Sequence, residues 1–195
     1  VTDQISAMGT NQLIVRPGQR RGSGTNAPKF KQKDVDLIST QVTGIAGVAP
    51  YSTISATVIF QAKNYTTLIT GTTNDFFTVG NWVLQSGRQF YDNELSAGKA
   101  SCILGTTVKN KLFGEGNPQG QRIRIKQFTC EVIGVLKSKG QSTWGTDQDD
   151  KVIMPLKTVH RRLMGSLDIE RMAVKVADSK KISIAQEKIT KLIRQ

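Results

Sequence analysis

The sequence predicts an α+β fold in which a discontinuous outer subdomain, residues 1–55 plus 166–195, carries an inserted β-rich subdomain, residues 56–165. Two observations predict this fold class. The two ends of the chain have the patterns strand-helix-strand and strand-helix, which one small α+β sandwich can combine. The middle consists of short β-branched or alternating segments separated by Gly, Pro and Asn turns, which is typical of a sheet with tight connections.

The N-terminal part begins with an apolar run that Pro17 and Gly18 end, and this run predicts a strand at residues 11–15. Residues 19–29 are rich in Gly, Ser, Asn and positive charge and predict an exposed loop. A helix is predicted from Gln32, because Val35, Ile38 and Val42 recur on one face, Asp34 favours the first turn and Gly44 ends it. Residues 48–60 then predict an extended segment.

The middle part predicts strands at 65–70, 100–105 and 151–154, and paired antiparallel strands over 122–136. Residues 71–90 predict a short helical turn and an extended piece, and residues 93–95 a turn. A helix capped by Thr106 or Thr107 is expected to follow the strand at 100–105. Residues 137–150 form the main loop, rich in Gly, Ser, Lys and Asp.

The C-terminal part predicts a short helix from Thr158 through Met164, a strand over 170–176 and a terminal helix from about Lys181. The terminal helix is supported by Ala185 and Ile189, which recur with Leu192 and Ile193 on one face. Because the chain starts without a methionine or signal peptide and stops within a helical pattern, we expect it to be a piece of a longer protein.

Charge and composition exclude several classes of function. The 195 residues carry a net charge of +12, with 27 Lys and Arg against 15 Asp and Glu, but the basic residues lack the aromatic interleaving that stacks bases. We therefore expect no nucleic-acid partner. No stretch approaches the roughly 18 uninterrupted apolar residues of a membrane span, so none is expected within the chain.

Catalytic and cofactor sites are not predicted. The chain lacks a glycine-rich phosphate loop, and the single histidine, His160, provides little for a zinc site or a catalytic triad. The acidic group Asp147, Asp149 and Asp150 lacks the glycine and terminal glutamate of a calcium loop, so a polar turn is favoured over a metal site. We expect no catalytic residue, no metal and no cofactor in this chain.

The two cysteines, Cys102 and Cys130, both fall in predicted strands and lack the spacing of a metal knuckle or a CxxC redox pair. Two interpretations remain open, which are buried free thiols and a disulfide between neighbouring strands.

Two groups of residues are candidates for binding. Trp144 lies within the polar segment GQSTWGT, where a tryptophan either folds back onto the protein or faces a partner as an anchor. Phe76, Phe77 and Trp82 form an aromatic cluster that fits either a core or a ligand pocket.

Seven segments follow one another in a characteristic order: GTNQLIVRPG (9–18), GIAGVAPYS (44–52), TGTTNDFFTVGNWVLQSGRQF (70–90), ILGTTVKNKLFG (103–114), NPQGQRIRI (117–125), IGVLKSKGQSTWGTDQDDKVIMPL (133–156) and RRLMG (161–165). Together they closely resemble the MacB-like periplasmic core domain of ABC-transporter permeases. The resemblance covers nearly the whole chain, and its motifs are structural rather than catalytic.

This resemblance implies a discontinuous Porter-like subdomain with an inserted Sabre-like subdomain, on the periplasmic face of the inner membrane between two transmembrane helices of the parent permease. It also implies that ATP and Mg²⁺ bind only in the parent's cytoplasmic ATPase domain, and that the parent is a homodimer. The implied partners are a MacA-like membrane-fusion adaptor and, indirectly, a TolC-type outer-membrane channel. The implied role is to transmit ATP-driven movement during export of macrolides, peptides or related compounds.

From the resemblance we predict that the loop contacts the adaptor through five residues: Lys139, Gln141, Ser142, Trp144 and Asp147. The alternative is a substrate-capturing module in which Phe76, Phe77 and Trp82 bind an amphipathic ligand. Relatives that release lipoproteins or respond to peptide antibiotics are a further alternative.

Overall fold

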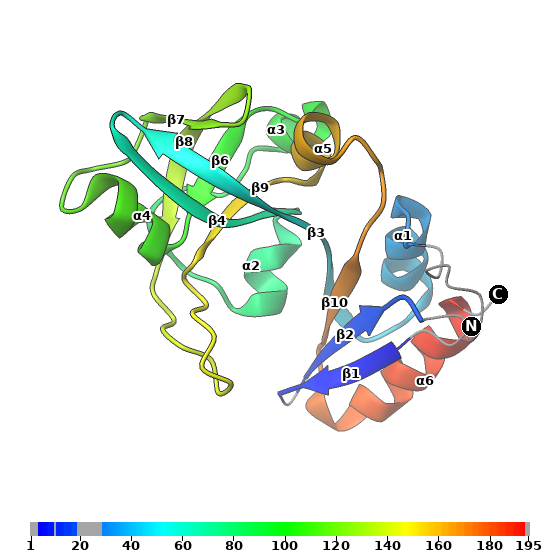
Figure 1. Ribbon diagram of the computed structural model, residues 1–195. Helices are drawn as coiled ribbons and strands as arrows, with labels where there is room; N and C mark the ends of the chain where they lie inside the picture. The colour runs from blue at the N-terminus through cyan, green and yellow to red at the C-terminus, as the bar shows by residue number, and fades with distance from the viewer. Residues whose placement is uncertain (1–3, 10, 19–28, 194–195) are drawn as a thin grey trace. The chain divides into compact units, whose positions relative to one another are not determined.

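The structure is a computed structural model that describes residues 4–9, 11–18 and 29–193. It is a mixed helix and strand fold, which confirms the predicted α+β class. The chain forms two compact units (Figure 1): unit 1 comprises Val1–Ser52, Asp75–Asn81 and Leu167–Gln195, and unit 2 comprises Thr53–Asn74 and Trp82–Ser166. The subdomain borders given above stay predictions. The loop predicted over residues 19–29 lies outside the described residues except for Lys29.

Unit 1 contains an antiparallel sheet whose strands follow the order β1, β2, β10 and β3. Their bounds are β1 (Gln4–Met8), β2 (Gln12–Arg16), β10 (Arg171–Val176) and β3 (Ile45–Phe60). The sequence reasoning missed β1, because only Ile5 and Ala7 give it apolar alternation. Pairing with β2 forms this strand, and Ile5 lies opposite Val15 while Ala7 lies opposite Leu13.

The α-helices of unit 1 pack their apolar faces on this sheet and on one another. They are α1 (Gln32–Gln41), α2 (Asp75–Gly80), the single turn η2 (Ser179–Lys181) and α6 (Ile182–Ile193). As predicted, Asp34 favours the first turn of α1, because its carboxylate accepts the Lys31 N–H at 2.8 Å. Helix α6 contacts β1, β2 and α1, with Ala185 and Ile189 buried on the face that the spacing predicts (Figure 1).

The strands of unit 2 pair in a closed circuit. From the second half of β3 the circuit runs through β4 (Lys63–Thr72), β9 (Lys151–Pro155), β6 (Ser101–Leu104), β8 (Phe128–Leu136) and β7 (Arg122–Ile125), and β7 pairs back to β3 at Val58 and Ile59. Strand β5 (Leu84–Gly87) adds to β8 outside this circuit. Closure of the circuit pairs the backbone N–H and C=O groups that would stay unpaired at the edges of an open sheet. The predicted pairing over 122–136 is confirmed.

The helices of unit 2 are α3 (Asp92–Ala97), α4 (Thr106–Phe113) and α5 (Leu156–Val159), and α5 continues as the π-helical turn η1 (His160–Met164). Helix α3 corrects the turn predicted at 93–95. The predicted cap of α4 is also wrong, because its N-cap is Gly105. The Thr106 hydroxyl donates to the Leu136 carbonyl at 3.0 Å, and that of Thr107 to Asp147 at 2.6 Å.

The core of unit 2 lies within the closed circuit of strands. Its fully buried side chains include Val58 on β3, Ile69 on β4, Ile123 on β7, and Val152 and Met154 on β9, so four strands contribute. The alternation predicted for β7 is confirmed, because Ile123 and Ile125 are buried while Arg122 and Arg124 are exposed. No helix in the described ranges is long and apolar enough to cross a membrane.

Candidate functional site

The segment between β8 and β9, residues 137–150, forms a small hairpin that extends from unit 2 (Figure 1, yellow). Gln141 and Asp147 form an isolated antiparallel bridge. At the tip, the Gly145 N–H donates to the Ser142 carbonyl at 2.9 Å, which closes a β-turn over residues 142–145. Gly145 has φ +81°, a conformation that glycine adopts without strain. We call residues 137–150 the Trp144 hairpin.

Asp149 fastens the base of the Trp144 hairpin. Its buried carboxylate accepts hydrogen bonds from the Ser138 hydroxyl at 2.6 Å, the Lys139 N–H at 2.8 Å and the Gly140 N–H at 3.0 Å. Burial alone would raise the pKa of this carboxyl, but these three donors and the charge of Lys151 together lower it below its usual value. Asp149 is therefore an ionised anchor for the start of the hairpin.

Two further carboxylates connect the hairpin to neighbouring elements. Asp150 accepts from the Tyr65 hydroxyl at 2.9 Å and from the Thr67 hydroxyl at 2.7 Å, both on β4. Asp147 accepts from Thr107 on α4. The acidic group that the sequence suggested as a polar turn thus holds the hairpin through protein donors, and the described part of the chain contains no cluster of three or more metal-ligating side chains.

Trp144 is at the tip of this anchored hairpin, and 89% of its surface is exposed. The sequence left its orientation open, and the structure places it away from the protein body. The hydrogen-bonded turn that carries this large aromatic side chain is already formed in the free chain. A partner that binds the ring therefore has little backbone entropy left to remove. The hairpin therefore holds the backbone at Trp144 in a defined turn and leaves the ring exposed.

The other residues predicted to contact an adaptor divide into two groups. Gln141 is exposed and Ser142 half-buried near the tip. Lys139 places its ammonium 4.2 Å from the centre of the Trp82 ring, and burial lowers the pKa of this ammonium while Asp149 raises it. Asp147 is bound to Thr107. In this structure Lys139 and Asp147 position the hairpin, and adaptor contact by these residues stays a prediction.

The aromatic residues predicted for substrate binding are core side chains of two different units. Phe76 and Phe77 are buried in unit 1, where Phe76 packs edge-to-face on Tyr51 and on Phe77. Trp82 is buried in unit 2, and Lys139 and Lys151 lie over its ring. Their burial gives all three rings a structural role, and a role in substrate binding stays a prediction.

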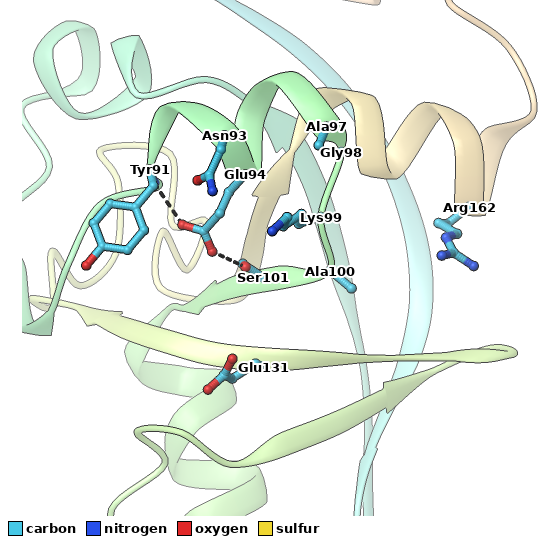
Figure 2. A pocket seen from close by; sticks show the side chains of 10 residues that line it. All are labelled: Tyr91, Asn93, Glu94, Ala97, Gly98, Lys99, Ala100, Ser101, Glu131 and Arg162. Carbon is cyan, nitrogen blue, oxygen red and sulfur yellow. Dashed lines mark hydrogen bonds between the residues drawn. The ribbon is translucent and has the colours of Figure 1, made fainter.

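A polar pocket of about 660 Å³ lies elsewhere on unit 2, beside α3 (Figure 2). Figure 2 shows Glu94 hydrogen-bonded to Ser101 in its wall, with Glu131 on β8 and Arg162 on η1 also lining it. Its lining residues are Tyr91, Asn93, Glu94, Ala97, Gly98, Lys99, Ala100, Ser101, Glu131 and Arg162. They come from three separate segments, which no local sequence pattern connects.

Glu94 in this pocket is engaged in holding the structure. Its carboxylate accepts from Arg88 at 2.6 Å, from the Tyr91 N–H at 2.8 Å, and from the Ser101 hydroxyl. Burial raises the pKa of Glu94, but these donors outweigh burial and lower it below its usual value. An ionised carboxylate that accepts several hydrogen bonds is a poor general acid or base at neutral pH, so Glu94 has a structural role in this pocket.

Sequence reasoning missed the side chains that donate hydrogen bonds to the hairpin's carboxylates. The donors are Tyr65, Thr67 and Thr107. Each lies 40 residues or more along the chain from the aspartate to which it donates. The only local signal was the density of aspartates before β9. That signal identifies a polar turn but not its partners.

Solved structures show which fold this is. The crystal structure of the periplasmic region of MacB from Actinobacillus actinomycetemcomitans is similar with a TM-score of 0.80 and 23% identity, covering 95% of this chain and 84% of that one. The extracellular domain of YknZ, a noncanonic ABC-type transporter from Gram-positive bacteria, has a TM-score of 0.75 and 22% identity, covering 90% and 88%. The fold is thus that of extracytoplasmic domains of ABC-type transporters.

The family is shown by sequence. The model of the MacB-like periplasmic core domain matches residues 1–192, and the chain belongs to this family. Among curated relatives, the macrolide export ATP-binding/permease proteins MacB of Rhodospirillum rubrum and Azoarcus sp. are 35% and 33% identical over 100% and 99% of this chain. The chain spans only 30% and 29% of the length of those two proteins. The family's description places such domains in the periplasm.

Proposed function

We propose that this chain is the periplasmic domain of an ABC-type efflux permease and that it contacts a MacA-like membrane-fusion adaptor through the Trp144 hairpin. Family membership and the relatives named for macrolide export support the first part. One observation carries the second part: Trp144, 89% exposed, stands at the tip of a hairpin held by three aspartates.

The energetic argument concerns ordering. A flexible loop loses conformational entropy when a partner fixes it, at about 0.5–1.5 kcal/mol for each side chain immobilised. The Trp144 hairpin is already fixed at its base by Asp149 and at its tip by the turn from Ser142 to Gly145. Contacts with an adaptor therefore need little further ordering of the hairpin backbone, and the side-chain cost at Trp144 remains. Tryptophan is also the residue type most enriched among side chains that dominate binding energy.

The proposed role of the chain is mechanical. In this proposal the folded domain is attached to the membrane permease and bound to the adaptor. It transmits movement because the domain takes a different position in each of the transporter's two states. ATP and Mg²⁺ act in the cytoplasmic domain of the parent protein in this proposal, and two copies of the parent form a homodimer. The exported compounds are macrolides, peptides or related molecules, passed on to a TolC-type channel.

The test is the Kd of the chain for the MacA-like adaptor of the same bacterium, before and after Trp144→Ala. We expect the Kd to rise roughly thirtyfold, corresponding to about 2 kcal/mol for loss of an anchor residue. Thermal unfolding of the variant is expected to match that of the original chain, because Trp144 packs against little. The matched control is Leu167→Ala, which removes a 68% exposed apolar side chain from unit 1 and should leave the Kd unchanged. An unchanged Kd for a folded Trp144→Ala chain would contradict the contact.

A further inference from the structure

Cys102 and Cys130 lie side by side in the wall of unit 2. Cys102 is on β6, and in the parallel pairing of β6 with β8 it is opposite Val132. Cys130 precedes Val132 by two residues on β8, so the two-residue period of a strand directs both cysteine side chains to the same face. Both cysteines are free thiols in this structure, and their Sγ atoms are 2.6 Å apart. The register of two strands, and not chance proximity of loops, brings these thiols together.

Both thiols are enclosed in the core of unit 2. Cys102 is 0% and Cys130 1% exposed, and both belong to the apolar cluster that contains Ile123, Val132 and Met154. Burial raises the pKa of the Cys102 thiol well above its usual value, because a thiolate in this core would lose its hydration. Since thiolate is the species that exchanges with disulfides, the folded chain protects these sulfurs from reagents in solution.

We infer that Cys102 and Cys130 are joined by a disulfide bond in the periplasm, formed while the chain folds. The family's periplasmic location supplies the setting, because the periplasm is an oxidising compartment in which disulfides form and persist. The geometry needs only a small approach of two atoms that already point at each other on rigid strands. This inference does not depend on adaptor binding.

The reaction is thiol–disulfide exchange with an oxidant that carries a reactive disulfide, either a periplasmic dithiol–disulfide oxidoreductase or a small-molecule disulfide. One cysteine thiolate attacks the oxidant's disulfide, which breaks and leaves a mixed disulfide. The second cysteine then attacks the mixed disulfide, and the bond between Cys102 and Cys130 forms. Two protons are released from the cysteine thiols and two electrons pass to the oxidant, whose sulfurs leave as thiols.

The bond would join β6 to β8 within the closed circuit of strands and enclose residues 102–130, which include α4 and β7. A crosslink of this kind stabilises mainly by restricting the unfolded chain, and the restriction grows with the length of the enclosed loop. We therefore expect reduction to weaken unit 2 and to be slow while the chain is folded, because the core must open before a reductant reaches the sulfurs.

The test is thiol counting on the 195-residue chain produced in a bacterial periplasm and unfolded in guanidinium chloride with iodoacetamide. Without a reductant we expect no alkylated cysteine, and after dithiothreitol two alkylated cysteines by mass spectrometry, with a Cys102–Cys130 peptide in the unreduced digest. Two alkylated cysteines without reductant, or a disulfide between two chains, would overturn the inference.

Denaturant unfolding gives a second, independent measurement. The midpoint of the original chain is expected to fall when dithiothreitol is present throughout, whereas the midpoint of the double variant Cys102→Ala, Cys130→Ala should not respond to dithiothreitol. The comparison uses the response to the reductant, so it remains valid if the double variant is less stable because of smaller side chains. A midpoint of the original chain that dithiothreitol leaves unchanged would overturn the inference.

Discussion

At the scale of single residues, the aspartate carboxylates of the hairpin and its exposed tryptophan ring have different roles. Asp149 and Asp150 accept hydrogen bonds from Ser138, Tyr65 and Thr67 and so hold the strand end in place. Trp144 takes part in none of these hydrogen bonds and is directed outward. In the proposed function, stability and adaptor recognition thus depend on different side chains, so mutations can separate them.

Fluorescence tests the placement of Trp144, because the chain has two tryptophans in opposite environments. Trp144 is 89% exposed and Trp82 is 8% exposed. We expect Trp144→Ala to shift the emission maximum to shorter wavelength and to reduce quenching by acrylamide, since only the buried Trp82 remains. Unchanged quenching in the variant would show that Trp144 is covered.

The pH dependence of stability tests the anchor at Asp149. Its pKa is lower in the folded chain than its usual value of about 3.9, so the carboxylate's contribution is complete above that value and is lost as the pH falls through the folded-state pKa. Asp149→Asn should lower the free energy of unfolding by about 2 kcal/mol at pH 7. It should also flatten the loss of stability on acidification below about pH 4.

The control for this prediction is Glu115→Gln, which neutralises an exposed carboxylate just after α4. Urea unfolding across the acid range measures both variants. An Asp149→Asn chain whose acid profile matches that of the original chain would show that this carboxylate does not anchor the hairpin.

At the scale of elements, the corner between β6 and α4 is packed directly against the start of β9. A Cβ atom built on Gly105, the N-cap of α4, would lie 2.1 Å from the Asp149 carbonyl oxygen and 2.8 Å from its carbonyl carbon. The Gly105 N–H also donates to the Lys151 carbonyl at 2.9 Å. Only glycine allows the two backbones to approach this closely.

Gly105→Ala is therefore expected to destabilise unit 2 by more than about 2 kcal/mol, since backbone atoms must separate to admit the methyl group. Gly120→Ala is the comparison, because Gly120 has open space around it and only its φ of +79° opposes a side chain, at about 1 kcal/mol. Denaturant unfolding measures both. Equal losses for the two variants would contradict the close approach at Gly105.

Elements with a local signal were predictable, and elements that depend on distant partners were not. The alternation of Ile123 and Ile125 and the helical spacing of Ala185 and Ile189 each indicate one face, and both faces are buried. Helix α3, predicted as a turn, has Tyr91 as its N-cap and is held by Glu94, which accepts from Arg88 and Ser101; these partners are near in sequence but follow no helical period. The closure of β7 on β3 has no signal in either segment alone.

The candidate site follows the same rule. The density of aspartates and the lone tryptophan identified the Trp144 hairpin from the sequence, but a tryptophan in a polar loop fits both a buried and an exposed place. Its exposure depends on the turn at Ser142 and Gly145 and on anchors in β4 and α4, which only the folded chain brings together. Likewise, the strand register that pairs Cys102 with Val132, and so places Cys102 beside Cys130, is a property of the sheet.

At the scale of the whole molecule, the chain forms two folded units, and the Trp144 hairpin extends from unit 2. We propose mechanical and binding roles for this domain, and its membership of the MacB-like periplasmic core domain family supports the proposal. The central claim is that the Trp144 hairpin touches the adaptor in the assembled transporter.

Photo-crosslinking in cells tests that claim most directly. A benzophenone amino acid replaces Trp144 in the full-length permease, expressed with its MacA-like adaptor, and replaces Glu115 in a parallel strain as an exposed control on unit 2. Irradiation is predicted to yield a permease–adaptor adduct from position 144 and none from position 115. An adduct from position 115 with none from position 144, or no adduct from either position in a transporter that still exports, would contradict the account.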